Sequence, residues 1–272
     1  MTQSIQLWKE YISSDPTYQY LCGLKKKGWL NPDGDKFFED RKRNATNPDP
    51  EVKESLYNMT LDIGNALAST TGVFKLESSY PRILDLCMAP GGFSATAKRE
   101  LPESIIDAIT LPPQTGGYEV MADNICRHIT YADITMYSKE MISDGHIPAD
   151  RPDSERFETS SPYVENQYDI VICGGAVAKA HLMERHRSEC ERSLLTVSQL
   201  VFAMNRLKPG GSIVLLLHHV ESWDTVCILH AFNQFSHIQL FKHPKCHAIK
   251  SSFYLVAKNI DLHHENAIIS LS

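Results

Sequence analysis

The residues best suited to bind a ligand lie between positions 81 and 100, where an apolar run meets two glycines. The run from Ile83 to Met88 is typical of a buried parallel strand. It is broken by Ala89-Pro90-Gly91-Gly92, and the residues from Phe93 onward favour helix. A strand, a glycine-rich turn and a helix begin a nucleotide site in a doubly wound sheet. Glycine lets a ligand approach the backbone, and the first N–H groups of the helix can face that ligand.

The composition of this turn differs from that of a dinucleotide site. The G-x-G-x-x-G pattern is absent, and the chain reads Asp85-x-x-x-Ala89-Pro90-Gly91-Gly92-Phe93 instead. This resembles the first motif of the FtsJ-like family of S-adenosylmethionine-dependent methyltransferases, D-L-x-x-A-P-G-G-[WF]-[ST]. The alternative is a tight turn in another kind of α/β protein. The resemblance implies S-adenosylmethionine as the cofactor and a pocket that uses Asp85, Ala89, Pro90, Gly91, Gly92 and Phe93.

The second predicted strand, residues 104–111, lacks the acidic side chain that often binds ribose hydroxyls in Rossmann-like sites. The resemblance places an aspartate at about Ile109, so the chain departs from the family there. We expect either Thr110 or Glu119, beyond the next turn, to replace it.

Two further cofactor positions follow from the resemblance. Asp133, at the end of a third strand predicted over 126–135, matches the family's aspartate that meets the adenine amino group. A carboxylate is a suitable acceptor for that group, and the alternative for Asp133 is a helix N-cap. A fourth strand, 168–176, is nearly all apolar, and Gly174 at its end is expected at the floor of the pocket.

FtsJ-like ribose methyltransferases use a Lys-Asp-Lys-Glu tetrad, and the chain departs from it. The Asp position is Gly174, the second Lys falls within Leu215–Leu217, and the Glu position is Ser252. The first Lys corresponds only weakly to Lys53. The sequence therefore predicts a cofactor site without the usual ribose 2′-O chemistry.

Three functions stay open on these grounds. The chain could methylate another acceptor with a different base, for which His218 and His219, after the fifth predicted strand, are the candidate catalytic residues. For these two the alternative is one core and one solvated histidine. The domain could instead be a catalytically degenerate binding or regulatory module. A ribose methyltransferase with a displaced catalytic set ranks last.

The elements that position these residues predict a Rossmann-like class I methyltransferase. We expect a mostly parallel seven-stranded sheet with helices on both faces, whose last strand is antiparallel beside the sixth. A helix is predicted over 187–207, with a core stripe of Leu194, Val197, Val201, Met204 and Leu207, ended by Lys208-Pro209-Gly210-Gly211. Residues 1–51 are predicted as a helical extension, 52–260 as the methyltransferase domain with a polar insertion loop at 137–167, and 261–272 as a tail.

The amino-acid composition limits which kinds of molecule the protein is expected to bind. The 272 residues carry a net charge of −6, which argues against a surface coated for nonspecific nucleic-acid binding. Seven scattered cysteines, no signal-like start and no long apolar run predict a cytoplasmic or nuclear protein without a membrane segment. None of the 12 histidines fits a metal-binding spacing, so no metal is expected. The acceptor is predicted to be an RNA or a small molecule, and a protein partner is possible.

Overall fold

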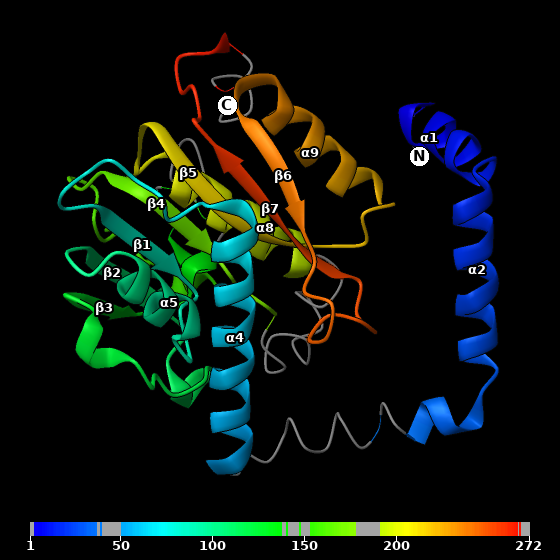
Figure 1. Cartoon of the computed structure of the whole chain (residues 1–272), viewed down its shortest axis with the longest axis horizontal. Helices are drawn as coiled ribbons and strands as arrows, with labels where there is room; N and C mark the ends of the chain where they lie inside the picture. The colour runs from blue at the N-terminus through cyan, green and yellow to red at the C-terminus, as the bar shows by residue number, and fades with distance from the viewer. Residues whose placement is uncertain are drawn as a thin grey trace.

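The computed structural model describes residues 3–36, 39, 50–137, 140, 147, 153–177, 191–265 and 267. These residues form a seven-stranded sheet in the order β3-β2-β1-β4-β5-β7-β6 (Figure 1). The strands are β1 (Arg82–Leu86), β2 (Ile105–Thr110), β3 (His128–Tyr131), β4 (Tyr168–Cys173), β5 (Leu207–His218), β6 (His237–Phe241) and β7 (Ser252–Lys258). Strand β7 is antiparallel to both β5 and β6, while the pairings from β3 to β5 are parallel. The predicted class I sheet is confirmed.

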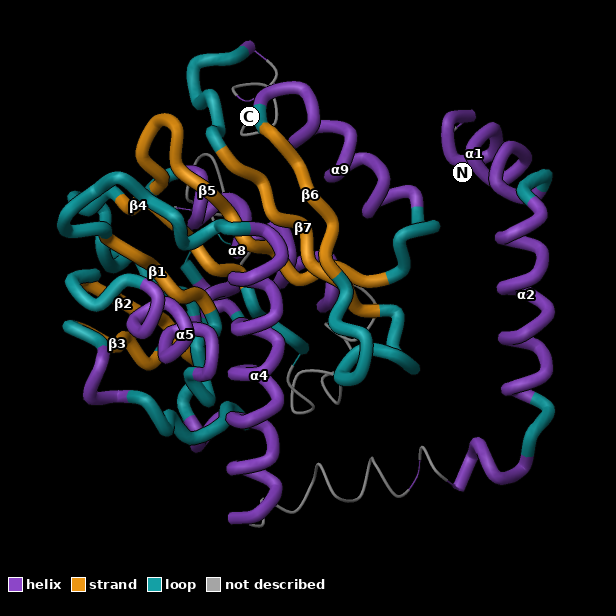
Figure 2. The backbone as a smooth tube through the Cα atoms, in the orientation of Figure 1, coloured by secondary structure: helices purple, strands orange, loops and turns teal. Residues whose placement is uncertain are grey.

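Helices cover both faces of the sheet. Helices α4 (Pro50–Thr71) and α5 (Gly92–Glu100) lie on the face toward the viewer in Figures 1 and 2. Helices α8 (Glu191–Met204) and α9 (Trp223–Phe235) contribute to the core of the other face. Side chains of a strand alternate between faces, so Ile83 packs in the core with α4 and α5 and Leu84 in the core with α8. Strands β1, β2, β4 and β7 are therefore buried on both sides, whereas the edge strands β3 and β6 are partly exposed.

The connection between β4 and β5 differs from the predicted one. The helix was expected to continue to residue 207, but α8 ends at Met204 and Leu207 already pairs with Tyr168 in the sheet. Residues 187–190 lie outside the described part of the chain. The predicted core stripe is confirmed at Met204 and Leu207, which are buried, but it is wrong at Val197, which is 52% exposed, and it misses the buried Leu195 and Phe202. Helix α8 buries the polar residues Ser198 and Gln199, which an apolar pattern does not identify.

The first two helices lie apart from the sheet, on the side of α9 (Figure 1). They are α1 (Gln3–Ser13) and α2 (Pro16–Trp29), and neither contains a buried residue. The indole N–H of Trp8 donates to the Glu221 carbonyl at 3.0 Å, and Lys25 Nζ lies 2.7 Å from Glu221 Oε1. The helical N-terminal extension is therefore present and contacts the loop that follows β5.

The described part of the predicted insertion packs against the domain. The Tyr163 hydroxyl donates to the Ala108 carbonyl at 3.1 Å, and Arg206 Nε donates to the Pro162 carbonyl at 3.0 Å. Arg206 is only 1% exposed and also bonds Glu140 at 2.6 Å. Residues 153–167, with the short 3-10 helix η4 (Ser154–Arg156), thus form an ordered cover over the β2–β3 edge.

Candidate active site

A cavity of about 490 Å³ opens at the carboxyl ends of β1, β2, β4 and β5. This is the edge at which ligands bind in open α/β sheets, and β1 and β4 flank the point where the strand order reverses. The cavity is also bordered by the N-terminal half of α4 and by the loop between β6 and β7. Of the candidate residues, those that line it are Asp85, Ala89, Pro90, Phe93, Thr110, Asp133, Gly174 and His218.

Asp85 is a buried carboxylate at the wall of this cavity. It is 1% exposed, and its Oδ2 accepts a 2.5 Å hydrogen bond from the Ser94 hydroxyl. Burial raises the pKa of Asp85 to about 7, against the lowering effect of the hydrogen bonds from Ser94. A positively charged ligand group beside Asp85 would favour the ionised form, so this residue suits a cationic partner.

The two glycines of the turn lie behind the cavity wall, where packing is close. Neither Gly91 nor Gly92 lines the cavity. Gly91 adopts φ of 109°, which disfavours other residues, and a Cβ there would lie 2.9 Å from the Ala122 Cβ. A Cβ on Gly92 would lie 2.3 Å from the Thr60 hydroxyl oxygen. The glycines therefore shape the turn and allow α5 to pack closely on α4.

Thr110 lies at the cavity, but its hydroxyl oxygen already accepts the Ala89 N–H at 3.2 Å. This hydrogen bond connects the end of β2 to the turn after β1. The Thr110 hydroxyl can still donate its own proton to another group. Glu119, the other candidate for the ribose position, lies 2.8 Å from Lys53 Nζ with its side chain 62% exposed. Neither Glu119 nor Lys53 is among the residues that line the cavity.

Asp133 lies at the cavity and also has the capping position that was the alternative for it. It lines the cavity, and it is the N-cap of the short 3-10 helix η3 (Ile134–Met136). Its Oδ1 accepts from the Thr135 N–H at 3.0 Å and from the Thr135 hydroxyl at 2.7 Å, while Oδ2 lies 3.8 Å from Arg156. The third strand is therefore shorter than predicted, because the capping bonds begin a helical turn at Asp133.

The positions at which the family resemblance expects catalytic side chains meet at the cavity. Gly174, Leu216 and Ser252 all line it. Of the three leucines considered for the lysine position, Leu215 and Leu217 belong to the core on the α8 face. A Cβ on Gly174 would meet nothing closer than the Phe93 ring at 3.9 Å. There is thus room for a side chain at Gly174, and glycine is not required by packing there.

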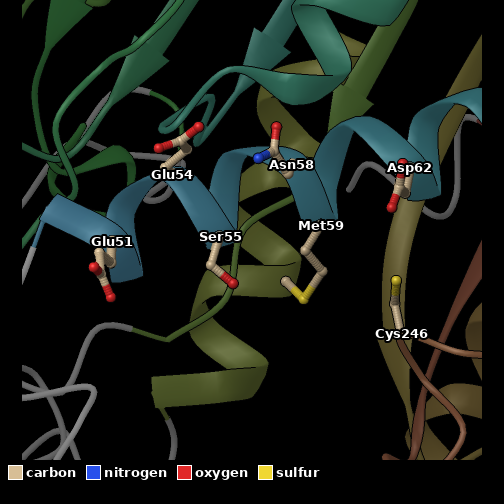
Figure 3. Close-up of a pocket in the computed structure, with 7 residues that line it drawn as sticks. All are labelled: Glu51, Glu54, Ser55, Asn58, Met59, Asp62 and Cys246. Carbon is tan, nitrogen blue, oxygen red and sulfur yellow. The ribbon is translucent and has the colours of Figure 1, made fainter.

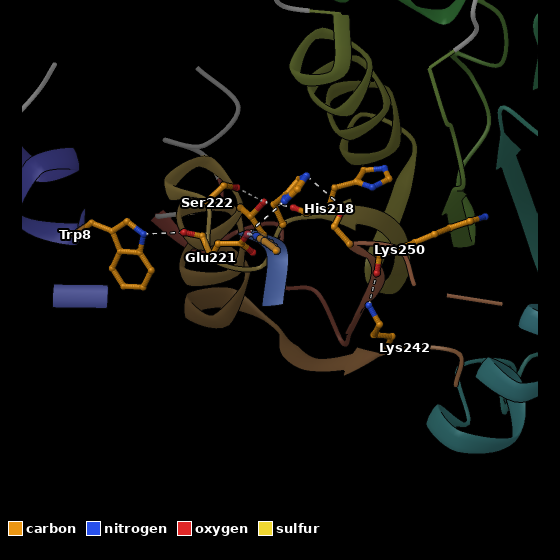
Figure 4. A network of polar contacts seen from close by, with 10 residues as sticks. Trp8, His218, Glu221, Ser222, Lys242 and Lys250 are labelled. Atoms are coloured by element: carbon orange, nitrogen blue, oxygen red, sulfur yellow. Dashed lines mark hydrogen bonds and ion pairs between the residues drawn. The ribbon is translucent and has the colours of Figure 1, made fainter. Parts of the chain in front are cut away.

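The two candidate histidines lie in different environments, and Figure 4 labels the one at the cavity, His218. His218 lines the cavity, and its Nδ1 lies 3.1 Å from the Ser252 hydroxyl oxygen. Burial first, and then nearby Arg192, lower the pKa of His218 to about 4, so the ring is neutral at pH 7. His219 does not line the cavity and lies 3.3 Å from Glu221 Oε1. The geometry brings only His218 to the candidate active site.

Several cavity residues were not identified from the sequence. Cys87 follows β1 with φ of 62°, an uncommon backbone conformation for a residue other than glycine. The loop between β6 and β7 contributes His247 and Lys250, and β7 contributes Tyr254. No sequence motif marks these residues, but the rule that a loop beside the carboxyl edge reaches the ligand could have suggested them.

A second hollow, of about 510 Å³, lies on the outer face of α4 near Cys246 (Figure 3). It is open and is lined by Glu51, Glu54, Ser55, Asn58, Met59, Asp62 and Cys246. None of the candidate residues lies there, and Met59 alone borders both spaces. The candidate active site is therefore the cavity at the carboxyl edge of the sheet.

The described residues show neither a cluster suited to a metal ion nor a helix suited to a membrane. No group of three or more His, Cys, Asp or Glu side chains there is arranged to hold a metal ion. In the same part of the chain, no helix has both the length and the apolar character that crossing a membrane requires.

Comparison with known proteins identifies one family. The family model described as FtsJ-like methyltransferase matches residues 66–260. No curated protein matches the sequence.

Solved structures show only a distant likeness. A ribosomal RNA methyltransferase from Plasmodium falciparum is 16% identical with a TM-score of 0.43, over 72% of this chain and 93% of that one. An rRNA methylase from Streptococcus thermophilus is 12% identical with a TM-score of 0.42, over 72% and 97%. Human methyltransferase-like protein 13 in complex with SAH is 12% identical with a TM-score of 0.39, over 79% and 86%. These values are too low to carry an argument about activity or substrate.

Proposed function

Because the chain belongs to the FtsJ-like methyltransferase family, we propose that it transfers a methyl group from S-adenosylmethionine to an acceptor other than a ribose 2′-hydroxyl. The observation that carries the proposal is the cavity at the carboxyl edge of the sheet. It is lined by Asp85, Ala89, Pro90 and Phe93 of the first motif, of which Asp85 is a buried carboxylate, and it has no charged side chain at Gly174, Leu216 or Ser252.

The residues present fit the cofactor. Asp85 would hold its cationic amino-acid end, and Asp133 would face the adenine amino group. Met88, Phe93 and Ile134 supply apolar walls, and the volume of about 490 Å³ lies within the usual range of ligand pockets. When bound, the cofactor supplies a methyl carbon activated by a positively charged sulfur.

The protein's own contribution to such a transfer is mainly positioning. Correct placement of donor and acceptor can supply about 7–11 kcal/mol of the barrier. An acceptor that carries a proton must also lose it, and His218 is the neutral base at the cavity. With a pKa of about 4, His218 is too weak a base to ionise an alcohol efficiently. We therefore expect the nucleophile to be an amine nitrogen or an acidic hydroxyl.

The test is a calorimetric titration of the purified chain with S-adenosylmethionine and S-adenosylhomocysteine. Micromolar binding of either is the expected result. The substitution Asp85→Asn, which keeps the shape of the side chain, should weaken binding of both ligands. Absence of binding by the unaltered chain would contradict the proposal and favour the degenerate binding or regulatory module instead.

A further inference from the structure

The cavity wall that follows β4 is held from behind by a side chain that does not itself line the cavity. We propose that Gln199 of α8 is a positioning residue of the site, which fixes the segment from Gly174 to Ala176 through the backbone N–H of Gly175. This inference rests on the proposed function, because it concerns a wall of the cavity proposed for S-adenosylmethionine. Gln199 belongs to no motif of the sequence.

The segment that follows β4 alternates between the cavity and α8. Gly174 and Ala176 line the cavity, whereas Gly175, between them, does not. A Cβ on Gly175 would lie 2.8 Å from Gln199 Oε1 and 2.9 Å from Cys87 Sγ, so Gly175 packs closely against both residues. Gly174 has no side chain and therefore borders the cavity with backbone atoms alone. The shape of this wall thus depends on where the main chain is held.

Gln199 is a buried amide with a hydrogen bond at each end of the amide group. It is 1% exposed. Its Oε1 accepts the Gly175 N–H at 2.9 Å, and its Nε2 donates to the Leu195 carbonyl, one turn earlier in α8, at 3.2 Å. The contact with Leu195 decides which end of the amide is the nitrogen, because a carbonyl oxygen only accepts hydrogen bonds. The helix itself therefore directs the oxygen of Gln199 toward Gly175.

Two further contacts hold the end of β4. The Gly174 N–H donates to the Leu86 carbonyl of β1 at 3.3 Å, and Cys173 Sγ lies 3.8 Å from the Gln199 carbonyl oxygen. Gly174 is thus attached to the sheet, whereas Gly175 is attached to α8. Strand β4 ends at Cys173, so Gln199 gives the Gly175 N–H the partner that the sheet no longer provides.

The polar character of Gln199 serves this contact rather than the packing of α8. An apolar side chain of the same length would occupy the same space, but the Gly175 N–H would then need another partner. The neighbouring Ser198 is also buried, and its hydroxyl has no hydrogen-bond partner among the described residues. Ser198 and Gln199 therefore differ in one respect that can be tested: only the Gln199 side chain bonds the segment at the cavity.

The experiment is a calorimetric titration of the full chain with S-adenosylhomocysteine at pH 6. Gln199→Met keeps the length of the side chain but offers only a weak acceptor. Gln199→Glu restores the acceptor oxygen, and because burial raises the pKa of a carboxyl, the introduced group can also donate to Leu195 at this pH. Ser198→Ala is the matched control, since it removes a buried polar group from the same turn of α8. Affinity should fall about 3- to 10-fold with Gln199→Met and less than about twofold with the other two variants.

The two substitutions at Gln199 separate positioning from packing. If the side chain only filled space, methionine would be tolerated at least as well as glutamate, because methionine brings no buried carboxyl. A Gln199→Met variant that binds as tightly as the unaltered chain would therefore overturn the proposal. Equal losses with Met and Glu at this position, or with Gln199→Met and Ser198→Ala, would overturn it too.

The contact can also be broken from Gly175. Gly175→Ala places a Cβ 2.8 Å from Gln199 Oε1, so the segment must move and the affinity should fall. Because Gly175→Ala and Gln199→Met disrupt the same contact, the double variant should lose less affinity than the product of the two single losses. Independent, fully additive losses in binding free energy would contradict a shared contact.

Amide hydrogen exchange gives a readout that does not need the cofactor. The Gly175 N–H should be protected in the unaltered chain and in Gln199→Glu, and should exchange at least about tenfold faster in Gln199→Met, while the amides of β4 keep their protection. Equally fast exchange of Gly175 in all three proteins would overturn the positioning role. This exchange pattern in a chain that does not bind S-adenosylhomocysteine would refute the proposed function alone. If Gln199→Met does not fold, the affinity of Gly175→Ala and the protection of Gly175 in the unaltered chain decide the question.

Discussion

The Ser94 hydroxyl donates a 2.5 Å hydrogen bond to Oδ2 of Asp85, and this contact joins β1 to the first turn of α5. Both side chains are buried, at 0% and 1% exposure. The strand and the helix are therefore fixed to each other on either side of the Ala89–Gly92 turn. Asp85 thus has a structural partner and also lies at the cavity wall, where a cationic ligand would favour its ionised form.

The first prediction concerns the pH dependence of cofactor binding. Burial raises the pKa of Asp85 to about 7, so the carboxyl becomes protonated as the pH falls through 7 and loses its attraction for a cation. Calorimetry should show the dissociation constant of S-adenosylmethionine rising up to about tenfold per pH unit below 7. Asp85→Asn should bind weakly with no such dependence. A wild-type affinity that is flat between pH 5 and pH 8 would contradict the role of Asp85.

The raised pKa of Asp85 also makes the free energy of unfolding depend on pH. This dependence has the opposite direction to that of cofactor binding. A carboxyl that holds its proton more tightly when folded stabilises the native state fully below its unfolded pKa of about 4. That contribution is lost as the pH rises through about 7, the pKa of folded Asp85. Relative to Asp85→Asn, the unaltered protein should therefore lose free energy of unfolding between pH 4 and pH 7, measured by urea denaturation at each pH.

A second prediction contrasts two glycines in the same site. Gly92→Ala places a Cβ 2.3 Å from the Thr60 hydroxyl oxygen and 2.4 Å from the Leu61 nitrogen, so α4 and α5 must separate. Urea unfolding should show a loss of about 1–3 kcal/mol, the usual cost of overpacking. Gly174→Ala meets only the Phe93 ring at 3.9 Å and should change stability by less than about 1 kcal/mol. Equal losses in the two variants would contradict the packing role assigned to Gly92.

A third prediction concerns the charge of the cavity histidines. The pKa values of His218 and His247 are both lowered to about 4, chiefly by burial and then by neighbouring cations. In a proton NMR titration, two imidazole signals should shift near pH 4, and His218→Gln should remove one of them. Because these pKa values are depressed, their contribution to stability is present above about pH 6.5 and is lost as the pH falls toward 4. Titration of both signals near pH 6.5 would contradict the burial of the site.

Apolar runs and a local motif determine some features of this fold but not the packing behind them. The apolar runs of β1 and β4 and the Asp85–Phe93 motif predicted the sheet and the turn, and four residues of the motif line the cavity that we propose as the cofactor site. The motif could not tell that Gly91 and Gly92 serve the turn and the α4–α5 contact, because that depends on which helix packs behind the turn. The stripe predicted for α8 wrongly included Val197, because the buried face of the helix contains the polar residues Ser198 and Gln199 at the positions that follow it.

The part of the cavity formed by β5, β7 and the loop between β6 and β7 was the hardest to predict from the sequence. His218 was found because it follows a predicted strand, but its neighbour His219 was grouped with it and lies outside the cavity. His247 and Lys250 come from a loop between the last two strands, where no motif marks them. Their position depends on the antiparallel placement of β7 between β5 and β6, which brings the loop to the carboxyl edge.

A fourth prediction concerns the N-terminal extension. Helices α1 and α2 contain no buried residue and contact the domain through Trp8 and Lys25 at Glu221. Deletion of residues 1–36 should therefore leave the domain folded, with a midpoint of thermal unfolding changed by only a few degrees. Trp8→Ala in the full chain should release the helices and make them more sensitive to limited proteolysis, whereas Tyr11→Ala, at an exposed position, should not. Unfolding of the truncated chain would contradict this description.

The central claim is that the cavity at the carboxyl edge of the sheet binds S-adenosylmethionine. Calorimetric titration of the full chain with S-adenosylmethionine tests it most directly, with Asp85→Asn as the altered site and Glu119→Gln, outside the cavity, as the control. The account predicts micromolar binding that the Asp85 substitution weakens and the Glu119 substitution does not. No binding by the unaltered chain, or equal binding by all three proteins, would contradict it.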